Sequence, residues 1–221
     1  MPPALRLVAG LTLLTLLDVP GLHAQHDNPA TAGPFRLYPT AEEVALARSA
    51  APAAVSDSAT IYVLRGTGFE KVVTGTNGVS CLVSRDHPES LYPICYDREA
   101  SRTIMPVELF EVVQRIAGMP EEQITAEIDR HMERGEFPSP ARGALTWMMS
   151  PRQVLYAGAT GPRAGRWHPH AMIYIPGATP AELGVAGLAP TGDFQVALPG
   201  TPRAHLIIQT VVWSDGSPHI R

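Results

Sequence analysis

Hydrophobic and polar positions divide this chain into short β-rich stretches at both ends and longer stretches of helical periodicity in the middle. Residues 60–65 place Ile61 and Val63 on one face and Tyr62 and Leu64 on the other, which is the pattern of a β-strand. The same reasoning predicts strands at residues 69–74, 79–84, 91–96, 144–149, 153–157, 170–175, 194–198 and 205–213.

Between these two groups of strands, hydrophobic residues recur every three or four positions, which is the spacing of helices with one buried face. One helix is predicted from Pro106 to Ala117, because proline suits a first helical turn and Gly118 follows as a stop. A second helix is predicted between Pro120 and Gly135. Its apolar face consists of Ile124, Ile128 and Met132.

Two Thr-x-x-Glu sequences indicate capping boxes. In a capping box, each of the two side chains accepts a hydrogen bond from the backbone N–H of the other residue. Thr40 and Glu43 are therefore expected to begin a short helix over residues 40–50. Thr179 and Glu182 are expected to begin a single helical turn.

Two local signals bear on how the first strands pair. Asn77-Gly78 suits the positive φ values of a tight hairpin, so the strands on either side of it are expected to pair with each other. Pro93 lacks a backbone N–H, so the strand that contains it is expected at an edge of the sheet.

The order of strands, helices and strands predicts an α+β fold. We expect a mostly antiparallel sheet, with a helical hairpin inserted between two groups of strands. Residues 40–221 are assigned to a single globular domain. Residues 25–39 contain Asn-Pro and Gly-Pro pairs and no hydrophobic period, so they are expected to form a flexible leader.

Residues 1–24 have the layout of a secretory signal peptide, with Arg6 before an apolar run from Leu7 to Leu17 and Ala24 as a small residue at the cleavage site. That run is too short to cross a bilayer, which takes roughly 20 apolar residues. The alternative is a frayed N-terminal helix of a protein that is not exported. Export predicts a periplasmic or secreted protein with no transmembrane segment after cleavage of the signal.

The composition limits the possible classes of function. Of the 221 residues, 45% are hydrophobic and 17% are charged, which is inconsistent with a disordered chain. The net charge of −4 gives no broad attraction for nucleic acid, so no nucleic-acid partner is expected.

Cys81 and Cys95 are the two cysteines of the chain. In an exported protein, an even pair at close spacing predicts a disulfide bond. The alternative is a metal ligand or a catalytic thiol, although the pair lacks the spacing of a metal motif.

The last third of the chain holds the residues best suited to a metal. His168 and His170 are two positions apart before an apolar stretch, and His205 begins another. If the three imidazoles converge, they form a ligand set for catalytic zinc. The alternative is a group of surface imidazoles, or of rings that are hydrogen-bonded at strand ends.

Other candidate sites are weaker. Trp147, Arg166 and Trp167 are candidates for ligand binding, although aromatic residues of this kind also fill cores. Glu108 and Glu111 lie one helical turn apart, and we expect them on a solvated face. The chain contains no Gly-x-Ser-x-Gly motif for a serine nucleophile.

Residues 75–81 (Gly-Thr-Asn-Gly-Val-Ser-Cys), followed by residues 93–95 (Pro-Ile-Cys), resemble a GTNGxxC…PxC pattern in a group of uncharacterised secreted bacterial proteins. The likeness extends to residues 140–142 and 147–151. The resemblance implies an exported bacterial family with paired cysteines, and it implies no activity, cofactor or catalytic residue.

These observations favour a non-catalytic role. We expect an exported soluble protein of the cell envelope that binds a small molecule or another protein. The alternatives are a metal-dependent enzyme that uses the three histidines and a structural component of the envelope without a ligand.

Overall fold

The strand predicted at residues 60–65 belongs to a sheet of eight strands in the computed structural model, which describes residues 31–158, 160–186 and 194–219. The strands are β3 Thr60–Arg65, β4 Gly68–Val73, β5 Ser80–Ser84, β6 Tyr92–Tyr96, β7 Leu145–Met148, β10 His170–Tyr174, β11 Phe194–Ala197 and β12 His205–Gln209. Their order across the sheet is β11-β12-β10-β7-β6-β5-β3-β4. Neighbouring strands are antiparallel except for β3 and β5, which are parallel.

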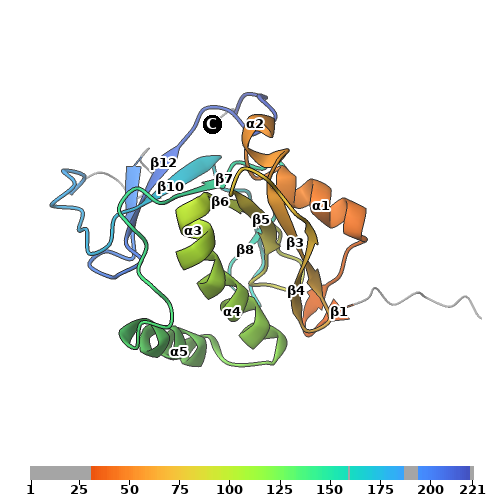
Figure 1. Cartoon of the computed structure of the whole chain (residues 1–221), viewed down its shortest axis with the longest axis horizontal. Coiled ribbons are helices and arrows are strands. Elements are labelled where there is room, and N and C mark those ends of the chain that lie inside the picture. The colour runs from red at the N-terminus through yellow and green to blue at the C-terminus, as the bar shows by residue number, and fades with distance from the viewer. Residues whose placement is uncertain (1–30, 159, 187–193, 220–221) are drawn as a thin grey trace, which may run out of the picture.

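Helices cover both faces of one half of this sheet. They are α1 Thr40–Arg48, α2 Ala53–Ser56, α3 Arg98–Thr103, α4 Met105–Ile116 and α5 Glu121–Glu133. Figure 1 shows α1 on one side of β3 and β5, with α3 and α4 on the other side. Because α3, α4 and α5 lie between β6 and β7 in the chain, the predicted α+β fold with an inserted helical hairpin is confirmed.

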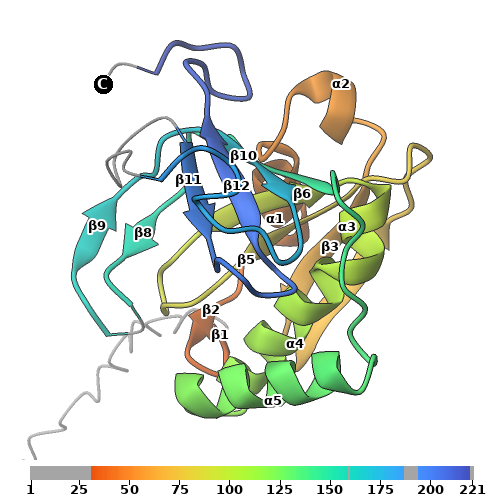
Figure 2. The same cartoon turned by 90° about the vertical axis from the view of Figure 1, so that its left-hand side faces the viewer.

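The described part of the chain adds two small hairpins to this sheet. One consists of β1 Thr31–Ala32 and β2 Phe35–Arg36, and the other of β8 Leu155–Tyr156 and β9 Arg163–Gly165. Figure 2 shows the β8–β9 hairpin projecting beside the C-terminal strands. Phe35 is only 1% exposed and packs against the core, so the expectation of a flexible leader is wrong for this part of residues 25–39. The signal peptide predicted at residues 1–24 lies outside the described residues.

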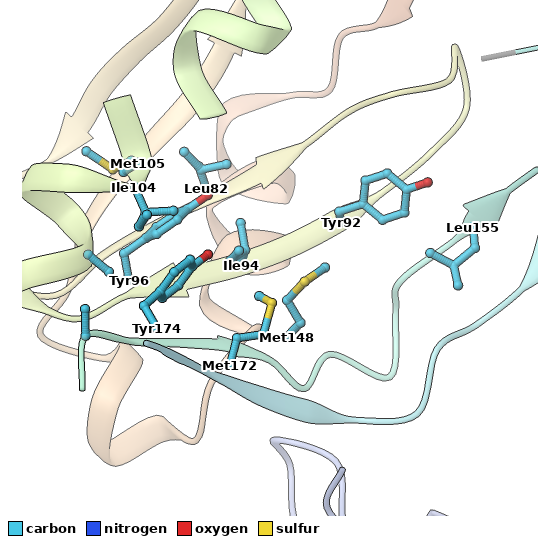
Figure 3. Packing of buried hydrophobic residues seen from close by; sticks show 12 residues of the cluster. Leu82, Tyr92, Ile94, Tyr96, Ile104, Met105, Met148, Leu155, Met172 and Tyr174 are labelled. Carbon is cyan, nitrogen blue, oxygen red and sulfur yellow. The ribbon is translucent and has the colours of Figure 1, made fainter. Parts of the chain in front are cut away.

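Strands β5 and β6 are buried along their whole length, and their side chains feed two cores. Cys81 and Val83 face a cluster beneath α1, whereas Leu82 and Ile94 face a second cluster beneath α3 and α4. Figure 3 shows the second cluster, where Ile94 lies between the two methionines of neighbouring strands and the tyrosines. Successive side chains of a β-strand point to opposite faces of the sheet, so the two cores lie on opposite faces.

The predicted disulfide bond joins Cys81 to Cys95. The two residues are directly opposite each other on β5 and β6, with their Cα atoms 4.1 Å apart. The bond is buried in the core beneath α1.

The edge position predicted for β6 is wrong, because β6 lies between β5 and β7. Leu91 donates its N–H to Val154, and Asp97 donates its N–H to Leu145, so alternate N–H groups of this strand point toward the same side. Pro93 has the same parity, but the β6–β7 ladder begins only at Cys95. Its missing N–H therefore faces an interval without a ladder partner.

The hairpin predicted at Asn77-Gly78 is also wrong, because β3 lies between β4 and β5. The turn itself is present: the Asn77 side chain accepts a hydrogen bond from Val79 N–H at 3.0 Å and donates to Val55 O at 2.7 Å. Gly78 has a φ of +81°, as expected for this pair. The crossover lets β5 pair in parallel with β3.

The capping box is confirmed at Thr179 and Glu182, where each residue bonds the backbone N–H of the other. It is wrong at Thr40 and Glu43, since no side chain caps α1. The carboxylate of Glu43 instead accepts hydrogen bonds from Leu64 N–H at 3.0 Å and from Arg85 Nη2 at 3.2 Å.

Two further elements differ from the expected ones, namely α3 and β12. Helix α3 was not expected, and its N-cap Asp97 accepts a hydrogen bond from Ala100 N–H at 2.7 Å. Strand β12 ends at Gln209, four residues before the predicted end at Trp213.

No helix of the described residues is long and apolar enough to span a membrane.

The disulfide should contribute measurably to stability. We predict that Cys81→Ser lowers the free energy of unfolding by roughly 2 to 4 kcal/mol under oxidising conditions, because the bond restricts the unfolded chain. Urea unfolding measures this loss. Reductant should lower the melting temperature of the wild type and leave that of the variant unchanged; equal responses of the two proteins would contradict the prediction.

The ion pair between Glu43 and Arg85 is almost fully buried, at 0% and 1% side-chain exposure. We predict that Arg85→Met lowers the free energy of unfolding by about 3 kcal/mol or more at neutral pH, because it leaves a buried carboxyl without its partner. Glu43→Gln combined with Arg85→Met should lose much less. Arg130→Met, which breaks an exposed ion pair with Glu127, is the control and should cost about 1 kcal/mol or less.

A single and a double variant that lose the same stability in urea unfolding would contradict this account of the buried pair.

Candidate functional site

A cleft opens beside α4, at the border between the part of the sheet that the helices cover and the part that they leave uncovered. Its volume is about 300 Å³. Strands β6, β7, β10 and β12 contribute its floor, and α4 contributes one wall. The residues that line it are Ser84, Asp86, Tyr92, Ile94, Ile104, Val107, Glu108, Glu111, Arg115, Met148, Trp167, Met172, Tyr174, Leu198, Arg203 and His205.

The floor of the cleft is apolar because alternate residues of adjacent strands face it. Met148 of β7 and Met172 of β10 lie near Ile94 of β6, and Figure 3 shows the three side chains together. Trp167 forms the rim and is 49% exposed. Its ring stacks on that of Tyr92 with the centroids 6.0 Å apart. The cleft thus offers both aliphatic and aromatic surface.

The wall from α4 is polar because of helical spacing. Glu108, Glu111 and Arg115 follow each other at intervals of three and four residues, so they share one face of the helix. The buried residues of α4, Met105, Val107 and Val112, anchor the rest of the helix. The expectation that the two glutamates lie on a solvated face is wrong, because both line the cleft.

Glu111 belongs to a balanced cluster of charges. Its carboxylate lies 3.2 Å from Arg203 Nη1 and 3.5 Å from Arg115 Nη2. Arg115 also donates to both carboxylate oxygens of Glu121, at 2.7 and 3.0 Å. Two guanidinium groups therefore face two carboxylates, and this cluster carries no net charge.

Glu108 stands apart from that cluster. It accepts a hydrogen bond from Ser84 Oγ through Oε1, and it forms no ion pair within the described part of the chain. Its pKa is raised to about 7, first by burial and then by the negative charge of Glu111. A carboxyl group with this pKa gains and loses a proton near neutral pH.

His205 of β12 also lines the cleft. Its Nδ1 lies 2.9 Å from Arg203 O, so Nδ1 carries the hydrogen and Nε2 is left as an acceptor. Burial lowers the pKa of this imidazole. The ring lies 4.9 Å from that of Tyr174, measured between centroids.

The three histidines predicted to bind zinc do not converge. His205 is paired with Tyr174, and His170 with Gln209, so the two histidines are four residues, or about 13 Å, apart along the strands. His168 instead contacts His219. Within the described residues, no three His, Cys, Asp or Glu side chains are grouped to hold a metal ion. The structure therefore does not bring the three expected ligands together.

The candidate ligand-binding residues separate into two groups. Trp147 packs beneath α1, on the face of the sheet opposite the cleft. Arg166 and Trp167 line a second cavity of about 390 Å³, and Trp167 also lines the first. His170 contributes to the second cavity, and its Nδ1 lies 2.8 Å from His168 O. Trp167 is thus the candidate that the structure places at the cleft.

Sequence reasoning missed Ser84, Glu108 and Arg203 as parts of one site. The available signal was the polar stripe on the helix, where Glu108 and Glu111 fall on a face that also contains Ile104. A stripe of this kind indicates a wall beside a cavity only when the opposite surface is known.

No protein-family model, curated protein or solved structure matches this chain significantly.

The raised pKa of Glu108 predicts a loss of stability with rising pH. The folded protein holds a proton on Glu108 up to about pH 7, whereas the unfolded chain releases it near 4.5, so the free energy of unfolding falls between these values. Glu108→Gln should abolish this fall. Relative to the wild type, the variant should gain about 2.5 kcal/mol between the lower and upper ends of that range.

Urea unfolding of both proteins across this pH range measures the difference. Glu122→Gln, on the exposed part of α5, removes the same formal charge and should differ from the wild type by a constant amount. A constant difference for Glu108→Gln as well would show that its carboxyl does not titrate near neutral pH.

Proposed function

We propose that this protein is an exported, non-catalytic binding protein of the cell envelope whose small-molecule ligand occupies the cleft between α4 and the sheet. The observation that carries the proposal is the combination of an apolar floor with a few polar groups in a cavity of about 300 Å³. Cavities that bind small molecules have this composition, because the apolar surface supplies affinity and the polar groups fix orientation.

The disulfide supports export. The bond between Cys81 and Cys95 is consistent with an oxidising compartment, such as the periplasm or the exterior of the cell. The signal-like sequence of residues 1–24 and the resemblance to secreted bacterial proteins point to the same compartment.

An acid–base enzyme is the second candidate. The observation that favours it is the pKa of Glu108, about 7, which suits proton transfer near neutral pH. Binding remains the preferred function because most of the cleft floor is apolar and only a few polar groups line it. Turnover of a bound ligand, abolished in Glu108→Gln, would favour the enzyme instead.

The methionine methyl groups provide a direct test of binding. Met148 and Met172 lie on the floor of the cleft, whereas Met119 and Met132 pack against α4 and α5 elsewhere. We predict that small aromatic fragments, beginning with 2-phenylethanol, shift the methyl NMR signals of Met148 and Met172, and that these shifts saturate with rising fragment concentration. The signals of Met119 and Met132 should stay unchanged.

If no fragment of the panel shifts Met148 or Met172, or if all four methyl groups shift alike, the cleft is not a specific ligand site. The proposal of a small-molecule-binding protein would then be wrong, and a structural role in the envelope would be favoured.

A further inference from the structure

When Glu108 is ionised, the groups that line the cleft carry more negative than positive charge. Both cations of its wall, Arg115 and Arg203, are balanced by Glu111 and Glu121. Two further carboxyl groups, those of Glu108 and Asp86, line the cleft and form no ion pair within the described residues. A ligand with a positive charge would supply the missing counter-charge.

The hydrogen-bonding groups of the cleft point to the same conclusion. Glu108 uses only one oxygen toward Ser84 and has no hydrogen bond to the other among the described residues. Asp86 Oδ1 is buried without a hydrogen-bond partner in the same part of the chain. His205 offers Nε2 as an acceptor, because its Nδ1–H is directed to Arg203 O. When Glu108 is ionised, all three groups accept hydrogen bonds, so a matching ligand donates them.

The apolar surface defines the rest of the ligand. Met148 and Met172 give the floor an aliphatic surface, and Trp167 and Tyr92 present stacked rings at the rim. Aromatic faces also attract cations, which adds to the effect of the carboxylates. A bound carboxylate or phosphate would instead meet the carboxyl groups of Glu108 and Asp86 and be repelled. The side chain of Asp86 has one hydrogen-bond partner, the hydroxyl group of Tyr92.

We infer that the ligand of the cleft is an organic cation, an amine joined to an apolar body, whose ammonium group binds the carboxylate of Glu108. This inference rests on the proposed function, because it assumes that the cleft binds a small molecule. The ammonium group donates to Glu108 and neutralises its charge, while the apolar body lies over the methionines of the floor.

Binding of this kind is linked to pH. Glu108 must be ionised to pair with the ammonium group, and the charges that act on it are Glu111 and Arg115 on α4 and Arg203 before β12. Tyr96 and Tyr174 face it from β6 and β10, and burial keeps both phenols neutral by raising their pKa values. Burial lowers the pKa of His205, which favours its neutral form. Glu108, with a pKa of about 7, titrates within the pH range of the binding test.

Three probes with the same body and different head groups test the inference: phenethylamine, 2-phenylethanol and 3-phenylpropionate. Titrations followed by the methyl signals of Met148 and Met172 give the affinities. At about pH 8 the amine should bind at least about tenfold more tightly than the other two probes. Its affinity should fall about tenfold between about pH 8 and about pH 6, whereas that of the alcohol should stay constant.

Two variants assign the effect to one carboxyl group. Glu108→Gln should reduce the affinity for the amine at least about tenfold and remove its pH dependence, with the affinity for the alcohol changed by less than about twofold. Glu122→Gln has the same change in net charge away from the cleft, and it should bind all three probes as the wild type does.

The outcomes separate the two proposals. If 2-phenylethanol or 3-phenylpropionate binds the wild type as tightly as phenethylamine and still shifts Met148 and Met172, the inference is wrong and the proposed function stands. If none of the probes shifts these two methyl groups, while the wider fragment panel also fails, both are wrong. An amine preference that survives in Glu108→Gln would also overturn the inference.

Discussion

The pairing of β5 with β6 is the constraint on which the rest of this structure depends. Both strands are buried on both faces, and most of their apolar side chains pack into one of two cores. The disulfide between Cys81 and Cys95 fixes their register from the face beneath α1. On the opposite face the same register brings Ser84 to Glu108 and places Ile94 in the cleft floor. A shift of one residue would exchange the two faces and remove the site.

The cleft exists because the helices cover only part of a wide sheet. Helices α3 and α4 pack over β6 and its neighbours, whereas β10, β11 and β12 extend beyond them, as Figure 2 shows. An apolar floor without a covering helix would be unfavourable in water unless something else shields it. The rim residue Trp167 and the polar wall of α4 supply part of that shield. A bound ligand would complete it.

Strands and helices could be predicted from the sequence because they depend on local periodicity, as residues 60–65 and the helix after Pro106 show. Spatial neighbours could not be predicted in this way. Pro93 indicates an edge strand in any local interpretation, and only the short ladder with β7 explains its central position. Glu43 matches a capping box, yet its partner Arg85 lies 42 residues away. The candidate site is the part that the sequence predicts least well, because only tertiary packing brings Glu108 next to its neighbours.

Glu43 and Glu108 show how the same side chain can serve folding in one place and binding in another. Burial raises the pKa of both carboxyl groups. Glu43 is accommodated by the guanidinium group of Arg85 and by a backbone N–H, so its charge is matched within the protein. Glu108 has a hydroxyl group as its only hydrogen-bond donor within the described residues, and it faces an open cavity. An unmatched charge lowers stability, and such groups cluster where a protein binds or reacts with another molecule. The contrast between the two glutamates therefore favours the cleft, and not the buried ion pair, as the functional part of the molecule.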